Sequence, residues 1–216
     1  MTADKFIAML GNMLEGCGQT LEIFALTAVM AVPLGFIVAL GRMNRHALVR
    51  GPIRIYQLIF RGTPLMLQLM FIFYGPYYLW DISYDRFAAC ILTFVLNYTA
   101  YFAEIFRSGI ESIPSGQYEA AKVLGYTKFQ TFFKVILPQV VKRVLPPTGS
   151  EFMTLVKDTA LAQIIAVPQL FEVAKKSANK NVSIIPLISA GVIYLILNAV
   201  VEMAFKKAEQ KLDYYK

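Results

Sequence analysis

Four polar residues recur at helical spacing in an apolar segment near the middle of the chain: Thr93, Asn97, Tyr101 and Glu104. Successive spacings of four, four and three residues put them on one face of a helix. A carboxylate in such an apolar helix is costly in lipid and usually faces a cavity or a partner. Glu104 could therefore act as a counter-charge for an ammonium or a guanidinium group. The alternative is an interfacial carboxylate that reaches toward water or pairs with Arg107.

Polar residues also interrupt two other apolar segments. Glu151, Lys157 and Asp158 lie among prolines and glycine in residues 144–171. They could form ion pairs, or mark backbone exposed to a path, and we expect pairing for Lys157 and Asp158. Gln68, like Thr63 before it, could line a path or form a hydrogen bond between helices.

A basic, amphipathic stretch over residues 119–139 separates two of the apolar segments. We expect Ser115 to cap a short helix over residues 117–124, with Glu119 in its first turn, where a carboxylate favours the helix dipole. Ala120 and Ala121 would let another backbone approach closely. Gly125 suits a left-handed C-terminal cap.

A second helix is predicted after this glycine. Thr127 and Gln130 have the spacing of a capping box. Four apolar residues then fall on one face at helical spacing: Phe129, Phe132, Phe133 and Ile136. Pro138 is expected to end or kink this helix. The pattern favours a knob that docks into a partner's groove, and a connector lying on lipid is the alternative.

The composition indicates which environment positions these residues. The chain is 57% hydrophobic and 16% charged, with a mean hydropathy of +0.54, which is typical of a membrane protein. Four uncharged runs approach spanning length: residues 23–41, 64–80, 87–103 and 182–201. Residues 144–171 predict a further, broken span, the fourth in chain order. Within the first run, Ala31, Gly35 and Ala39 form a small-residue stripe suited to close helix packing.

The predicted fold is therefore an all-α integral membrane protein with five transmembrane helices in a single transmembrane domain over residues 1–216. The spans are expected at about 18–42, 62–80, 86–107, 143–171 and 182–203, with a cytoplasmic loop over 108–139. Lys and Arg number five in the loop predicted over residues 42–61, six in residues 107–143 and four from Lys206 onward, against five in the other segments once Lys157 is left out. This bias predicts an N-terminus outside and a C-terminus inside.

Several classes of protein are disfavoured. Cys17 and Cys90 show neither a disulfide framework nor metal-ligand spacing, and we expect no metal site. The first residues lack the pattern of a cleaved signal peptide. The basic charge is expected to face anionic lipid, not nucleic acid. An intramembrane hydrolase would need a nucleophile and base or a metal cluster, and the single histidine, His46, lies in a basic segment, so no catalytic residue is predicted.

Sequence motifs carry a resemblance to a known family. The residues EAA at 119–121, Gly125, and Leu137 with Pro138 resemble the EAA loop of importer permeases of the ATP-binding cassette class, with Val135 where isoleucine is usual. Three further stretches are similar to the polar amino acid subfamily: RGTPLMLQLMFIFYG from Arg61, AYFAEIFRSGIESIPSGQYEAAKVLG from Ala100 and LPPTGSEFMTLVKDTAL from Leu145. Together they cover most of residues 18–205.

The resemblance implies a permease subunit of a polar amino acid importer in a bacterial cytoplasmic (inner) membrane. It implies a coupling helix, seated on a separate ATPase subunit, with these residues: Glu119, Ala120, Ala121, Leu124 and Gly125. It also implies that Asn97 and Glu104 line an amino acid pocket by which the substrate crosses through alternating access. ATP and Mg would be bound by the ATPase, and no cofactor by this chain, which has no phosphate-binding GxxxxGK[ST] loop.

The expected partners are the ATPase subunits, an extracytoplasmic amino acid-binding protein and a second permease chain, as a homodimer or a heterodimer. The alternative function is an ion-coupled secondary carrier of amino acids that uses Glu104. The lack of an internal repeat and the presence of the EAA stretch oppose it. The amino acid itself stays open, because a carboxylate suits an α-ammonium as well as a cationic side chain.

Overall fold

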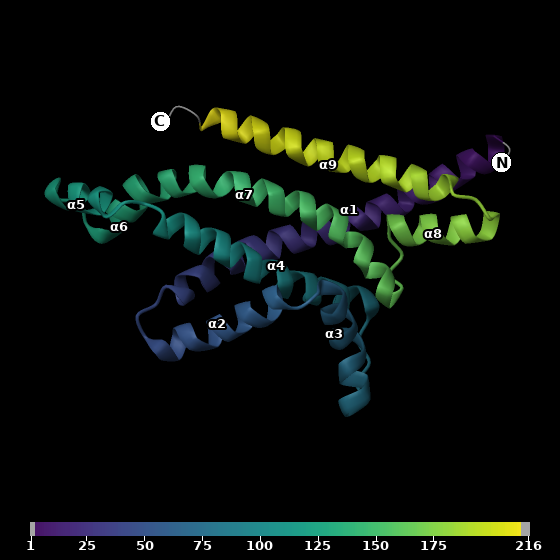
Figure 1. Ribbon diagram of the computed structural model, residues 1–216, viewed down its shortest axis with the longest axis horizontal. Helices are drawn as coiled ribbons and strands as arrows, with labels where there is room; N and C mark the ends of the chain where they lie inside the picture. The colour runs from purple at the N-terminus through teal and green to yellow at the C-terminus, as the bar shows by residue number, and fades with distance from the viewer. Residues whose placement is uncertain (1–2, 213–216) are drawn as a thin grey trace.

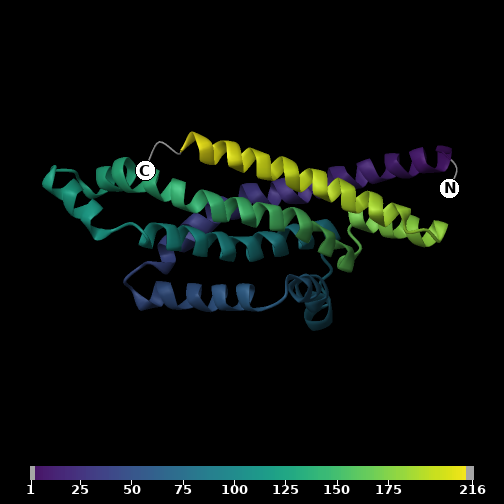
Figure 2. The same cartoon turned by 45° about the horizontal axis from the view of Figure 1, so that its top comes forward.

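The computed structural model describes residues 3–212, which are almost entirely helical. In chain order the elements are α1 (Ala3–Arg42), α2 (Ala47–Gly62), α3 (Leu65–Trp80), α4 (Arg86–Glu111), α5 (Ser115–Val123), α6 (Lys128–Gln130), the π-helix η1 (Thr131–Ile136), α7 (Leu137–Asp158), the 3₁₀-helix η2 (Thr159–Ile165), α8 (Leu170–Asn181) and α9 (Ile185–Lys211). Figures 1 and 2 show α1, α4, α7 and α9 as long rods packed along one another.

Three helices in the described part of the chain are long and apolar enough to cross a membrane: Phe6–Arg42, Arg86–Glu111 and Ile185–Lys211. A fourth span results if α2 and α3, which meet at a bend of 109°, count together. The protein is thus an all-helical membrane protein with three to four such spans. α7 is not among them, since it carries charged residues from Lys142 to Asp158.

The centre of the bundle is the contact between α1 and α4. Ala31 and Ala39 are fully buried, and a Cβ added at Gly35 would lie 2.7 Å from the Cβ of Phe102. The small-residue stripe therefore lets the two backbones approach closely, as the sequence predicts. Phe94, Tyr98 and Phe102 on α4 fill the space beside it with aromatic rings.

The segment between the first two predicted spans is helical, so its prediction as a loop over residues 42–61 is wrong. It forms α2, whose exposed side includes Leu48, Ile55 and Leu58 and which also carries arginines. The break falls at Thr63 and Pro64, because proline excludes the α conformation for the residue before it. The second span of the predicted plan is thus sharply bent.

The prolines of α7 act differently from the sequence prediction. Pro146 and Pro147 lie inside one continuous helix, and the helix changes to 3₁₀ geometry only at Thr159. At the start of α7, Pro138 offers no N–H, and its ring crowds the carbonyl four residues earlier. The preceding turn is widened into η1, a π-helix, so the chain continues without an end at Pro138.

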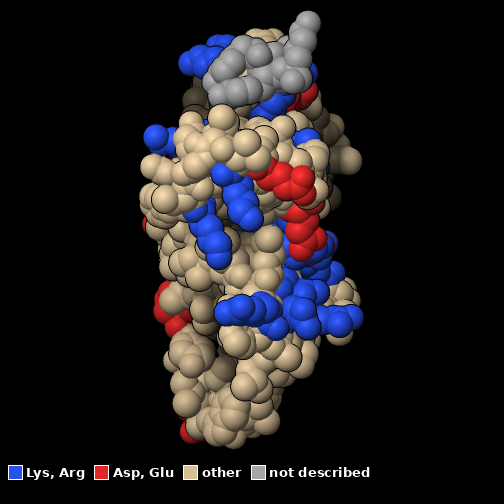
Figure 3. All heavy atoms as spheres, turned by 90° about the vertical axis from the view of Figure 1, so that its left-hand side faces the viewer, with Lys and Arg blue, Asp and Glu red and all other residues tan. Residues whose placement is uncertain are grey.

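Basic residues gather at one end of the bundle. Figure 1 shows α5 and α6 at one end, together with the α1–α2 connection and the C-terminal end of α9, while the start of α1 and α8 lie at the other. Figure 3 views the first end and shows Lys and Arg gathered on it. The three basic segments of the sequence therefore meet on one side, as the charge count predicts.

Candidate functional site

The short helix α5 begins earlier than predicted. Pro114 occupies the N-cap position and Ser115 is the first helical residue, with no side-chain cap, so the prediction of Ser115 as the N-cap is wrong. Proline fits here because it fixes φ near the value that a helix entry needs. At the other end, Gly125 has φ +78°, and its N–H donates to the carbonyl of Lys122 at 3.0 Å. The predicted left-handed cap is confirmed.

The tip formed by α5 and the turn after it is unusually apolar for an exposed surface. Val123 and Leu124 are 87% and 72% exposed, while Glu119 and Ala120 are also open. Ala121 is 2% exposed, so it packs within the chain. Sequence reasoning missed Val123, although an apolar pair just before a helix-ending glycine is a usable signal. Exposed apolar side chains on a protruding helix are typical of a docking surface.

The helix after the turn starts as predicted. The Thr127 hydroxyl accepts from the Gln130 N–H at 3.3 Å, and the Gln130 side chain accepts from the Thr127 N–H at 3.0 Å. The four apolar residues do not share one environment, because Ile136 is fully buried whereas Phe129 and Phe133 are 70% and 48% exposed. Their rings lie 4.3 Å apart and extend the exposed apolar surface.

The polar face of α4 divides into two parts. Thr93 is fully buried and donates to the carbonyl of Ala89 at 2.7 Å. Asn97 is also buried, and its amide donates to the carbonyl of Phe60 at 3.0 Å and to Oε1 of Gln68 at 2.9 Å. Both amide hydrogens of Asn97 are therefore used inside the chain, and the side chain ties α4 to α2 and α3.

Gln68 completes this connection at the α2–α3 bend. Its Nε2 lies 2.9 Å from the Phe60 carbonyl, 3.0 Å from the Thr63 carbonyl and 2.9 Å from the Thr63 hydroxyl. A broken helix leaves carbonyls without partners, which is costly away from water. We call Asn97, Gln68 and Thr63 the bend lock, because they satisfy these groups and join the bend to α4.

The other two residues of the polar face, Tyr101 and Glu104, line a cavity of about 440 Å³. Glu104 accepts from Arg107 Nη2 at 2.5 Å and Nε at 3.0 Å, a bidentate pair, and lies 3.7 Å from Arg61 Nη1 across the α2–α4 contact. The Arg61 guanidinium also lies 5.4 Å from the centre of the Tyr101 ring. One carboxylate and several cations thus face the same space.

Arginines dominate the wall of this cavity. Arg42 from the end of α1 and Arg54 from α2 join Arg61 and Arg107 around it. Sequence reasoning treated Arg42 and Arg54 only as part of a charge count, because nothing in the sequence shows that α2 folds back against α4. A cavity with four guanidinium groups and one carboxylate can hold an anion such as a carboxylate, with Glu104 available to a cation.

The charged residues of residues 144–171 belong to α7 and are not among the residues that line this cavity. The Tyr98 hydroxyl donates to Asp158 Oδ2 at 2.8 Å, so an aromatic residue of α4 holds this carboxylate. Glu151 is half-buried, and Lys157 is exposed. The hydrogen bond joins α4 to α7 at the point where α7 changes to η2.

Comparisons with known proteins agree with one another. The family described as "Binding-protein-dependent transport system inner membrane component" matches residues 31–214. The chain is 35% identical to the L-cystine transport system permease protein TcyB of Bacillus subtilis (strain 168), over 93% of this chain and 86% of that protein. It is 34% identical to the arginine transport system permease protein ArtQ of the same organism, over 92% and 91%.

A solved structure resembles the whole chain. It is described as an amino acid ABC transporter with histidines, and it covers 98% of this chain and 100% of its own with a TM-score of 0.89 at 28% identity. Similarity extends across the bend, the polar face and the α5 tip, because little of either chain is left out.

Proposed function

The chain belongs to the family of binding-protein-dependent transport system inner membrane components, and from this premise we propose how its residues serve transport. It is the permease component of a binding-protein-dependent ABC amino acid importer, located in the inner membrane and not catalytic. The ATPase is a separate subunit, and the family implies ATPase and binding-protein partners. This assignment replaces the alternative function, which was an ion-coupled secondary carrier of amino acids.

In the proposed arrangement, residues 1–216 form one domain with five spans, in which α2 with α3 is the second and α7 with η2 is the broken fourth. The basic end faces the cytoplasm and the start of α1 faces outside. The gathering of Lys and Arg at the end that holds α5 supports this orientation, because cytoplasmic segments carry the excess of positive charge.

The α5 tip is proposed to be the coupling helix. Glu119, Ala120 and Leu124 would contact the ATPase, which holds ATP and Mg, while Ala121 and Gly125 would fix the shape of the tip. The exposure of Val123 and Leu124 supports this role, since apolar side chains that meet nothing in their own chain suit a partner's groove. A second permease chain, identical or homologous, would complete the path, with an external binding protein delivering the substrate.

The proposed substrate contact is the cavity at Glu104. The observation that carries it is the 3.7 Å approach of Arg61 to Glu104, which sets a cation beside an anion on one wall. A zwitterionic amino acid carries the complementary pair, with its ammonium suited to Glu104 and its carboxylate suited to Arg61. Binding would exchange part of the internal pairing for pairing with the substrate, with Tyr101 beside it.

The remaining residues of the path are proposed to position it. Asn97, Gln68 and Thr93 would hold the wall of the path through the bend lock and the α4 backbone. Glu151, Lys157 and Asp158 would act in the broken fourth span, where the Tyr98 hydrogen bond to Asp158 fixes α7 against α4.

Substitution of Glu104 tests the substrate contact. Glu104→Gln keeps the shape and removes the charge, and a charge-assisted hydrogen bond is worth about 1.5 to 3 kcal/mol, so uptake affinity should fall by about ten- to a hundredfold. The measurement is uptake of arginine, histidine, glutamine and glutamate by proteoliposomes containing the assembled transporter at matched permease amounts. Loss of cationic substrates alone indicates a side-chain contact, whereas uniform loss indicates the α-ammonium.

Arg107→Gln is the matched control, because Arg107 holds Glu104 in the bidentate pair. A purely structural pair predicts that both variants lower stability to a similar extent and leave the order of substrate preference unchanged. Normal uptake of all four amino acids by Glu104→Gln at normal expression would exclude Glu104 as a substrate ligand.

A further inference from the structure

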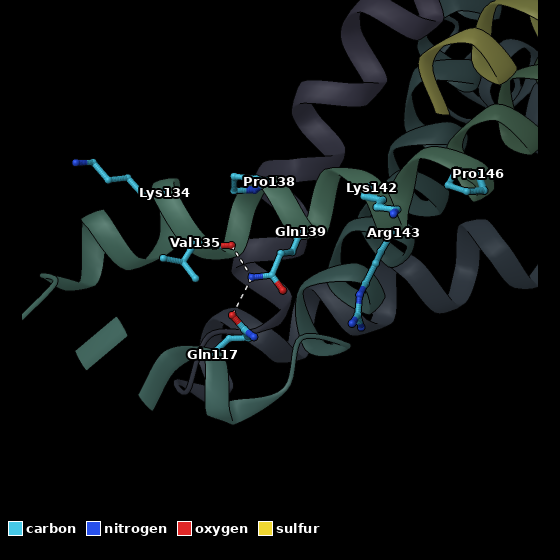
Figure 4. Close-up of a pocket in the computed structure, with 8 residues that line it drawn as sticks. All are labelled: Gln117, Lys134, Val135, Pro138, Gln139, Lys142, Arg143 and Pro146. Atoms are coloured by element: carbon cyan, nitrogen blue, oxygen red, sulfur yellow. Dashed lines mark hydrogen bonds between the residues drawn. The ribbon is translucent and has the colours of Figure 1, made fainter. Parts of the chain in front are cut away.

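A second cavity, of about 650 Å³, lies between α5 and the first turns of α7. We call it the basal groove. Figure 4 shows Gln139 and Gln117 facing each other at its middle, with Arg143 extending on one side and Lys134 on the other. Gln139 Nε2 donates to Gln117 Oε1 at 3.1 Å and to the Val135 carbonyl at 2.8 Å. This pair joins the coupling helix to α7.

The basal groove has a positive lining. Its basic members are Lys134, Lys142 and Arg143, and no Asp or Glu lines it. Arg143 donates to the backbone carbonyl of Ser112, a neutral group, and Lys134 lies 6.0 Å from the centre of the Tyr126 ring. Within residues 3–212 neither Lys134 nor Arg143 pairs with a carboxylate. Among the described residues, no carboxylate therefore offsets these two charges, which favours an anion.

The rest of the lining is apolar. Val135 of η1 and Pro138 and Pro146 of α7 line the groove together with the polar residues. Phe133 and Phe129, next along the chain, are largely exposed. A groove with cations at its rim and apolar side chains beside them matches a ligand that is anionic at one end and apolar at the other.

We propose that the basal groove binds the headgroup phosphate of an anionic phospholipid from the cytoplasmic leaflet. The proposal rests on the proposed orientation, which sets the junction of the α5 tip and α7 at the membrane surface. Arg143 offers a planar fork to the phosphate oxygens, Lys134 adds a mobile charge, and the two glutamine amides can hydrogen-bond the glycerol. The apolar residues distinguish a lipid from a free phosphate, which would gain nothing from them.

Equilibrium binding in a neutral detergent tests the proposal on the assembled transporter. Dioctanoyl phosphatidylglycerol is the probe, with dioctanoyl phosphatidylcholine and inorganic phosphate as comparisons. A basic residue near an anionic membrane surface contributes about 1 kcal/mol, so Lys134→Gln should weaken phosphatidylglycerol binding about fivefold. Gln117→Glu should weaken it similarly, because the new carboxylate faces the phosphate while it still accepts from Gln139. Lys207→Gln removes a charge from the exposed side of α9, outside the basal groove, and should leave binding unchanged.

The outcomes divide as follows. Selective phosphatidylglycerol binding that both groove variants weaken and the control retains supports the proposal. Equal binding of phosphatidylcholine, displacement of the lipid by an equal concentration of inorganic phosphate, or unchanged affinity in both variants overturns it. An absence of lipid binding in the assembled transporter also overturns the proposal, and would indicate that the ATPase covers the groove. Copurification of the ATPase checks that each variant is folded. Since the readout is lipid binding, its failure is separate from failure of the Glu104 experiment, which reads uptake.

Discussion

Replacement of Asn97 by leucine is expected to loosen the α2–α3 bend. The substitution keeps a similar volume but removes the hydrogen bonds to the Phe60 carbonyl and to Oε1 of Gln68. The Phe60 carbonyl keeps its bond from Gln68 Nε2, so one acceptor stays satisfied. Oε1 of Gln68 is left buried with no donor from Asn97.

The size of the effect follows from these contacts. Hydrogen bonds between helices in a membrane are worth about 0.6 kcal/mol on average and up to about 1.7. Leaving one buried acceptor without a partner costs about 1 to 3 kcal/mol. We therefore expect Asn97→Leu to lower the free energy of unfolding by about 2 to 4 kcal/mol. Uptake should fall as well, because α3 and α4 no longer hold one geometry beside the path.

The assay is the free energy of unfolding of the full chain in mixed lipid–detergent micelles, with uptake measured in proteoliposomes. Thr27→Val is the control, because the Thr27 side chain is fully buried and its hydroxyl has no partner in the described structure. That variant should not lower the free energy of unfolding, because it removes a buried hydroxyl that has no hydrogen-bond partner in the described structure. If Asn97→Leu is as stable as Thr27→Val, the bend lock contributes nothing and the argument fails.

Three further substitutions test other parts of the chain. Glu119→Lys reverses an exposed charge at the α5 tip, so insertion should be normal while copurification of the ATPase and ATP-driven uptake fall; full values of both refute the coupling role. Gly125→Val forces a β-branched residue to φ +78°, at about 1 to 2 kcal/mol, and should impair the same two readouts; normal copurification and uptake would contradict the need for a left-handed residue here. Gly35→Leu should cost about 1 to 3 kcal/mol, because its Cβ would meet Phe102, whereas Gly18→Leu, with open space around its Cβ, should be tolerated in the same unfolding assay.

Local signals in the sequence predicted local structure well. The capping box at Thr127 and Gln130 and the left-handed Gly125 depend on residues within one turn, so their spacing is sufficient. The small-residue stripe at Ala31, Gly35 and Ala39 also predicted close packing of α1 against another helix, because small side chains let two helix backbones approach. The prediction of Ser115 as the N-cap was wrong because the neighbouring Pro114 takes that position, one residue earlier.

Long-range partners could not be predicted in the same way. Gln68 and Asn97 are hydrogen-bonded across 29 positions, and their meeting depends on the 109° bend. The sequence indicates that the arginines of α2 are cytoplasmic charges. It does not show that Arg61 reaches Glu104. Pro146 and Pro147 predicted a break that is absent. Burial of Val144 and Gly149 against neighbouring helices favours a continuous helix there despite the lost backbone hydrogen bonds.

The connection between the coupling tip and the path is short and tightly packed. α4 carries Glu104 and the Asn97 member of the bend lock, and only residues 112–114 separate it from α5. Ile110 near the end of α4 and Ile113 within this connection are buried against Ile136, Val140 and Val144 from η1 and α7. Arg143 binds the Ser112 carbonyl in the same place. If α5 has the proposed coupling role, a force applied to it by the ATPase would move α4 and the start of α7 together, because the close-packed interior between them leaves no space to absorb the displacement. In that proposed mechanism α4 would carry the displacement to Glu104 and Asn97, whereas a loosely packed loop at residues 112–114 would not transmit it.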